Sequence, residues 1–199
     1  EVDENKMNHV IRDYGVGSIL NSPFSGQDVH GGLNAQQWLN IINPIQDFAM
    51  NSTASKIPII YGLDSLHGAN YISGSTLFPH PIGVASSFDP ELAKISSEIT
   101  AKDTRAAGVH WIFGPNVENA INPLWSRVYE TYGEDPLVCS RFGAAATIGL
   151  QGDDISNSEK AAACLKHYVG YGAPRSGKDR TDAWIPESYL RQYFLPSFK

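Results

Sequence analysis

The sequence predicts an α/β fold, in which helices cover a parallel sheet. Four short segments are dominated by apolar residues, as expected of strands that are buried on both faces. These segments are residues 16–20, 57–61, 109–113 and 161–169. Helical patterns separate them, and an alternation of fully apolar strands with helices is typical of a parallel sheet.

The first half of the chain begins with a helical pattern. Its apolar residues recur at helical spacing and are Met7, Val10, Ile11 and Tyr14. Gly15 is expected to end this helix, before the first strand. A second helix is predicted over 33–50, where Pro44 should kink or divide it. The strand at 57–61 follows.

The second half of the chain carries clearer helix signals. An Asp-Pro pair at the start and a glycine at the end indicate a helix over 89–108. The segment 135–152 repeats both signals and is expected to form another helix. A last helix is predicted to begin near Pro186, after the strand at 161–169.

The order of elements predicts part of a (β/α)₈ TIM-type barrel. A closed barrel has eight strands and typically about 250 residues, whereas four strands are predicted in these 199 residues. The first helix has no strand before it, and no strand follows the last helix. We therefore expect residues 1–199 to form part of one barrel domain, without an internal boundary and without a second domain.

Composition excludes several classes of protein. The net charge is −6 without a basic stripe, so nucleic acid is not an expected partner. No apolar run approaches the roughly 20 residues of a membrane span. The polar opening "EVDENK" does not resemble a signal peptide. Cys139 and Cys164 are too few for a disulfide framework and are expected as buried thiols. The sequence indicates no oligomeric state.

One triplet is a candidate for covalent modification. "NST" at 51–53 makes Asn51 an acceptor for N-glycosylation. Such triplets are common by chance. The triplet favours a secreted or lysosomal glycoprotein only weakly.

Polar segments follow the carboxyl ends of the predicted strands, where α/β folds build their active sites. These segments are 21–26, 62–68, 114–119 and 166–180, and "SRVYETYGEDP" adds further charges. The candidate residues are Asp64, His67, Asn116, Glu118, Arg127, Glu130, Lys166 and His167. Acidic, basic and amide groups on one rim suit a small polyhydroxyl ligand, because they can bind neighbouring hydroxyls.

Each candidate also has a structural interpretation. Asp64 could hydrogen-bond loop amides, and His67 could be a buried structural histidine. Arg127 could brace its loop by pairing with Glu130 or Glu134. Lys166 lies inside the apolar strand predicted at 161–169 and must reach a partner or the strand end, since an unpaired buried charge is costly.

A metal site is an alternative to a site for a polyhydroxyl ligand. Asp64, His67 and His167 could act as ligands on a hydrolase barrel. The paired histidines of a typical barrel metal site are absent from the sequence, so no metal is expected.

Three segments together resemble glycoside hydrolase family 3, the β-glucosidase family. Residues 62–93 resemble its Gly-Val-Asp-x-x-His-Gly segment. "NPLWSRVYETYGEDP" is similar to its Trp-Gly-Arg-x-x-Glu-x-x-x-Glu-Asp-Pro segment, and "CLKHYVGYG" to its Lys-His-Phe-x-Gly-x-Gly segment. The three motifs occur in the family's order and span nearly the whole chain.

The resemblance implies a role for four residues. Asp64 would bind hydroxyls of the terminal sugar in the first subsite, and Arg127, Lys166 and His167 match the family's other sugar-binding positions. The implied activity is retaining hydrolysis of β-glucosides or β-glucan oligosaccharides, which needs two carboxylates and no cofactor.

The chain departs from the family pattern in three places. Leu124 and Ser126 replace the usual Arg and Gly around the tryptophan, while Arg127 is kept. Val169 and Tyr171 favour the β-glucosidase branch over the β-N-acetylglucosaminidase branch. The family's Ser/Thr-Asp-Trp nucleophile segment is missing, because "TDAW" at 181–184 has a different spacing.

The nucleophile and the acid/base glutamate are therefore expected outside these residues. A non-catalytic carbohydrate-binding fragment is the alternative.

Overall fold

The computed structural model describes residues 2–20 and 32–199 and contains a short central sheet. Its strands are β1 (Ser18–Leu20), β3 (Ile60–Leu63) and β5 (Trp111–Ile112). They lie in the order β1-β3-β5, and both neighbouring pairs are parallel. The prediction of a parallel α/β sheet is confirmed, although the observed strands are shorter than the apolar runs.

The fourth predicted strand, 161–169, does not form a regular strand. It runs beside β5 but pairs only through two isolated parallel bridges, Trp111 with Ala162 and Asn116 with Lys166. The chain that it faces beyond β5 contains Pro115, which has no N–H to donate to a ladder.

A second small sheet was not predicted. It consists of β2 (Leu33–Asn34) and β4 (Ile72–Ser73), which pair in parallel. Strands of two residues are too short for any periodicity in the sequence to reveal them.

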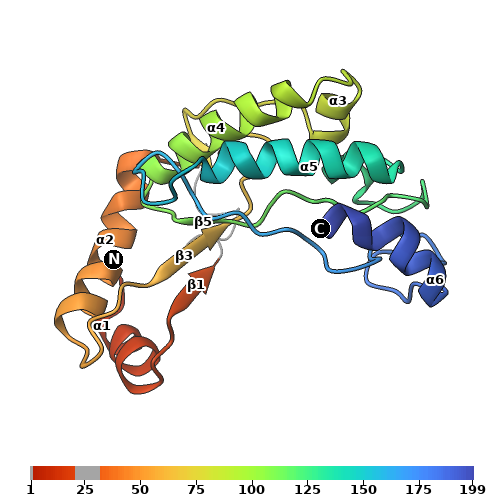
Figure 1. Ribbon diagram of the computed structural model, residues 1–199. Coiled ribbons are helices and arrows are strands. Elements are labelled where there is room, and N and C mark those ends of the chain that lie inside the picture. The colour runs from red at the N-terminus through yellow and green to blue at the C-terminus, as the bar shows by residue number, and fades with distance from the viewer. Residues whose placement is uncertain (1, 21–31) are drawn as a thin grey trace.

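Three long helices cover the outer side of the sheet. They are α2 (Ala35–Asn51), α4 (Pro90–Ala106) and α5 (Pro136–Gln151). Figure 1 shows α4 and α5 side by side above the strands, and α2 beside β3, so that the elements form an open arc. None of the helices in the described part of the chain could cross a membrane.

The capping signals are confirmed. The Asp89 side chain accepts the N–H of Glu91 at the start of α4, and the Asp135 side chain accepts those of Leu137 and Val138 at the start of α5. These bonds satisfy N–H groups that have no partner within the helix.

The prediction that Pro44 would divide α2 was wrong, because one helix runs from Ala35 to Asn51. Pro44 lies on the exposed face, where water can bind the backbone carbonyl that its missing N–H leaves free. A capping box between Asn34 and Gln37 fixes the start of this helix.

The remaining helical segments are short. α1 (Glu4–Met7) continues as a wider π-type turn over Asn8–Asp13, and α3 (Pro81–Ala85) precedes α4. The end of the chain holds α6 (Glu187–Tyr189), followed by π-type and 3₁₀ turns to Phe198. A helix beginning near Pro186 is thus confirmed, in irregular form.

The core lies between the sheet and the helices. Trp38 and Ile42 of α2 pack on Leu63 of β3, and a second cluster under α4 includes Phe142 and Cys139. Cys139 is buried as expected, whereas Cys164 is only half-buried, and neither forms a disulfide.

We expect Gly68→Ala to destabilise the protein strongly, because Gly68 shapes the loop that carries Asp64. Its φ is +97°, and an added Cβ would collide with the backbone oxygen of Thr76. Urea denaturation should show a loss of at least about 3 kcal/mol. Gly74→Ala is the control, since its φ is +86° but no described atom lies within 4 Å of an added Cβ. It should cost about 1 kcal/mol, and equal losses would contradict this account.

Candidate functional site

Polar segments meet at the carboxyl edge of the sheet, as predicted. Residues 64–80 follow β3, residues 114–119 follow β5, and residues 167–180 follow the bridged segment. The predicted polar loop at 21–26 lies outside the described residues.

Asp64 and Lys166 form the closest ion pair of the site. The Lys166 Nζ donates to the Asp64 Oδ1 at 2.6 Å. The lysine side chain is 10% exposed and the aspartate side chain 41% exposed. The expectation that Lys166 reaches a partner is confirmed, and the buried ammonium orients a carboxylate that solvent can still reach.

Arg127 pairs with Glu130 through two hydrogen bonds. Its Nε and Nη2 donate to the two carboxylate oxygens at 2.8 and 2.7 Å. These bonds raise the pKa of Arg127 further above its ordinary value. The brace inferred from the sequence is therefore present, and it holds the guanidinium 5.7 Å from the centre of the Tyr171 ring.

His167 is a neutral imidazole in this environment. Burial lowers its pKa to about 4, and the positive charges of Arg127 and Lys166 lower it as well. The carboxylates of Glu130 and Asp64 oppose this shift. The other three residues predicted for the sugar site thus lie within electrostatic reach of His167.

Glu118 occupies a different place from the one expected. The sequence placed its carboxylate near the rim, but the residue is 0% exposed. Its oxygens accept the backbone N–H groups of His167 and Gly172. Burial raises its pKa to about 7, although these backbone hydrogen bonds act in the opposite direction.

Asp179 joins the site although the sequence did not point to it. Its Oδ1 accepts the Trp125 Nε1–H at 2.9 Å and the Tyr171 hydroxyl at 2.6 Å. Because Trp125 lies 54 positions away in the chain, no local pattern could have identified this contact. The three side chains tie the arginine loop to the segment after Lys166.

The open hollow at this edge has the size of a sugar site. Its volume is about 640 Å³, and it is lined by Arg127, His167, Tyr168, Val169, Gly170, Tyr171, Arg180, Thr181 and Ala183. Typical ligand sites measure about 300–1,000 Å³. Two of the four predicted residues, Arg127 and His167, therefore line a hollow that can hold a sugar.

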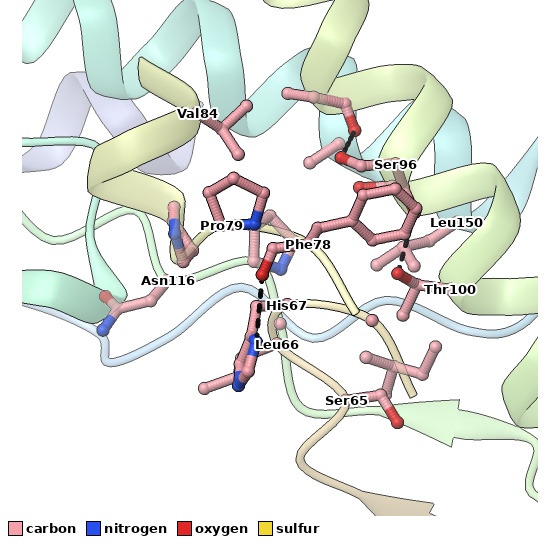
Figure 2. A pocket seen from close by; sticks show the side chains of 18 of the residues that line it. Ser65, Leu66, His67, Phe78, Pro79, Val84, Ser96, Thr100, Asn116 and Leu150 are labelled. Atoms are coloured by element: carbon pink, nitrogen blue, oxygen red, sulfur yellow. Dashed lines mark hydrogen bonds between the residues drawn. The ribbon is translucent and has the colours of Figure 1, made fainter. Parts of the chain in front are cut away.

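A second cavity lies deeper and is too small for a ligand of that kind. It is about 30 Å³ and is lined by residues of the loop after β3 and of α4. A buried water needs about 10–15 Å³ of such space, so the cavity has room for one or two waters. Figure 2 shows His67 against it, with its Nδ1 3.2 Å from the Phe78 carbonyl oxygen.

That contact supports the structural interpretation of His67. His67 is half-buried, and its ring lies 4.2 Å from that of His80, measured between centroids. Over residues 2–20 and 32–199, no group of three His, Cys, Asp or Glu side chains is placed to bind a metal.

An arc of parallel strands that gathers polar side chains at its carboxyl edge is typical of α/β-barrel domains, which build their active sites there. The chain belongs to glycoside hydrolase family 3. The sequence pattern of the "Glycosyl hydrolase family 3 N terminal domain" matches residues 2–199. The resemblance drawn from the three motifs is confirmed.

Known relatives agree with this family. Lysosomal beta glucosidase of Dictyostelium discoideum is 50% identical over 205 residues, which is 99% of this chain and 25% of the relative. A beta-xylosidase of Formosa agariphila is 35% identical over 161 residues, 77% of this chain and 22% of the relative. The chain spans about a quarter of the length of these curated relatives.

Solved structures show the same fold. A mutant of exo-1,3/1,4-beta-glucanase from a Pseudoalteromonas species superimposes with a TM-score of 0.85 at 34% identity, covering 94% of this chain and 31% of that one. Beta-glucosidase from Listeria innocua in complex with glucose gives a TM-score of 0.76 at 31% identity, covering 92% and 23%. The partial barrel inferred from the sequence agrees with these neighbours.

Proposed function

We propose that this chain supplies the first sugar subsite of a β-glucosidase. The longer protein would hydrolyse terminal β-D-glucosyl residues of glucosides or β-glucan oligosaccharides. The observation that carries the proposal is the 2.6 Å pair of Asp64 and Lys166 beside Arg127 and His167. Relatives named as a β-glucosidase and an exo-β-glucanase support the substrate class.

The four side chains have complementary tasks in this proposal. Asp64 accepts hydrogen bonds from ring hydroxyls, while Lys166 and Arg127 donate to hydroxyl oxygens. A neutral His167 can donate from one ring nitrogen and accept at the other. This combination orients an uncharged sugar that offers both donors and acceptors.

The reaction would follow the retaining double displacement. That mechanism needs a nucleophile and an acid/base carboxyl about 5–5.5 Å apart on either side of the bond. Glu118 is buried under backbone amides and Glu130 is held by Arg127. We therefore place both catalytic carboxyls outside these 199 residues, in the rest of the barrel and in a second domain.

Turnover by the full-length protein tests the proposal. Release of nitrophenol from the aryl β-D-glucoside should exceed release from the matched α-D-glucoside by orders of magnitude. The β-D-xyloside is the necessary comparison, because one relative is a beta-xylosidase. Glucose binding by calorimetry without turnover would favour the non-catalytic alternative. The absence of both turnover and glucose binding would overturn the proposed sugar site.

We further propose that the protein is a secreted or lysosomal glycoprotein that carries a glycan at Asn51. Asn51 is the last residue of α2 and is exposed, so a glycan has room there. Relatives named lysosomal and periplasmic support a location outside the cytosol.

A gel shift tests the glycan on Asn51. Protein from its own source should lose mass on treatment with an N-glycosidase, and Asn51→Gln should reduce that loss by the mass of one glycan. Thr53→Ala, which removes the third position of the triplet, should do the same. A glycan-free native protein would refute the modification.

A further inference from the structure

We infer that Glu118 is a positioning residue that acts through the segment 167–172. Its buried carboxylate holds both ends of this segment and so sets where His167 and Tyr171 stand in the sugar hollow. The inference rests on the proposed function of that hollow. It assigns a task to a buried carboxylate that has no role in the proposed sugar contacts and is not one of the two catalytic carboxyls.

The carboxylate divides its two oxygens between the two ends of the segment. Its Oε1 accepts the N–H of His167 at 3.2 Å, and its Oε2 accepts the N–H of Gly172 at 3.0 Å. The residue is 0% exposed, so water does not compete for these bonds. Losing one partner would leave a buried amide unsatisfied, which costs more than the bond itself contributes.

The base of this clamp is itself fixed. The Asn116 Oδ1 accepts the backbone N–H of Glu118 at 3.1 Å. The backbone N–H of Val117 donates to the carbonyl oxygen of Lys166 at 3.0 Å. The carboxylate therefore projects from a backbone that is already paired with Lys166, just before His167. Because this backbone is held in place, the carboxylate can fix the position of the segment 167–172.

Gly172 shows how closely the two parts approach. A Cβ at this position would stand 2.6 Å from the backbone oxygen of Asn119 and 3.2 Å from the Cβ of Glu118. Only glycine lets the segment come near enough for its N–H to reach the carboxylate. The close contact and the hydrogen bond thus depend on each other.

The segment carries side chains that face the hollow. The Tyr171 ring centroid lies 4.9 Å from that of His167, and the Arg127 guanidinium carbon lies 5.7 Å from the Tyr171 ring centre. A shift of the segment would move His167 directly and Arg127 through Tyr171. Misplacement by about 1 Å can reduce turnover by about 100-fold.

The test compares Glu118→Gln with wild type in the full-length protein at pH 8, above the raised pKa of Glu118, where the wild-type side chain is a carboxylate. Glutamine keeps the volume but turns an NH₂ group towards one of the two backbone N–H groups, so one end of the segment is released. We expect kcat/KM for the aryl β-D-glucoside to fall about 10- to 100-fold, and the inhibition constant of glucose to rise. Thr100→Val is the matched control, because its buried hydroxyl donates to the Ser96 carbonyl within α4. It should leave turnover unchanged.

A double variant separates positioning from general stability. If Glu118 acts through His167 and its neighbours, E118Q should lower kcat/KM by less than about 3-fold when His167 has already been replaced by alanine. Equal losses in both backgrounds would overturn the inference, as would normal kinetics of E118Q. If E118Q does not fold, Glu118→Asp, which keeps both oxygens on a shorter stem, replaces it in the same comparison. Failure of the proposed function would appear separately, as absent turnover in the wild type.

Discussion

Replacing Asp64 by alanine in the full-length protein should lower kcat/KM for a β-glucoside by about 1,000-fold. Each charge-assisted hydrogen bond to a sugar hydroxyl contributes about 1.5–3 kcal/mol, and the variant loses those that Asp64 makes. It also leaves the buried Lys166 ammonium without its partner at 2.6 Å. Steady-state kinetics on the aryl glucoside would measure the loss.

The control for this variant is Asp154→Ala. Asp154 is an exposed carboxylate in the turn after α5, and its removal should change kcat/KM less than twofold. The kcat/KM of Asp64→Asn should lie between those of wild type and Asp64→Ala, because the amide keeps one acceptor oxygen but loses the charge. Near-normal kinetics of Asp64→Ala would refute the assignment of the first subsite.

Features that depend on neighbouring residues were accessible from the sequence. The N-terminal caps of α4 and α5 need only Asp89 or Asp135 and the amides one turn ahead, so the starts of both helices were predicted correctly. The parallel sheet was accessible for a similar reason, since buried strands are apolar on both faces. Resemblance to a family then gave the four residues proposed for the sugar site, which local patterns alone left open.

Features that depend on distant residues were not accessible. The sequence required that Lys166 reach a partner or the strand end, but it could not name Asp64, which lies 102 positions away. Glu118 was placed at the rim because it sits in a polar stretch, yet residues 167–172 cover it. The segment 161–169 pairs irregularly with a neighbour that contains Pro115, and this pairing cannot be read from the segment's own residues.

Glu118 and His167 should give the folding stability opposite dependences on pH. The pKa of Glu118 is raised from 4.5 to about 7. Between these values the unfolded chain loses the proton and the folded protein keeps it, so the contribution of Glu118 to stability is lost as the pH rises through this window. For this buried group, the change is about 3 kcal/mol.

The contribution of His167 to folding stability changes with pH in the opposite direction. Its pKa falls from 6.5 to about 4, so its contribution is present above pH 6.5 and is lost as the pH falls towards 4. The ring is only partly buried, and solvent screening reduces this change to about 1–2 kcal/mol. The titratable groups packed around this pair in the described structure include Cys139, Tyr171, Arg127 and Lys166.

Unfolding measured from pH 4 to pH 8 should separate the two groups. Relative to wild type, Glu118→Gln should become more stable as the pH rises from 4.5 to 7, whereas His167→Gln should become more stable as the pH falls from 6.5 to 4. A flat difference for either variant would contradict the shift of that group. For Glu118→Gln the result has a further consequence. The variant could gain stability at neutral pH while it loses turnover at the same pH. That combination would show that the carboxylate serves to position the segment 167–172 and does not serve the stability of the fold.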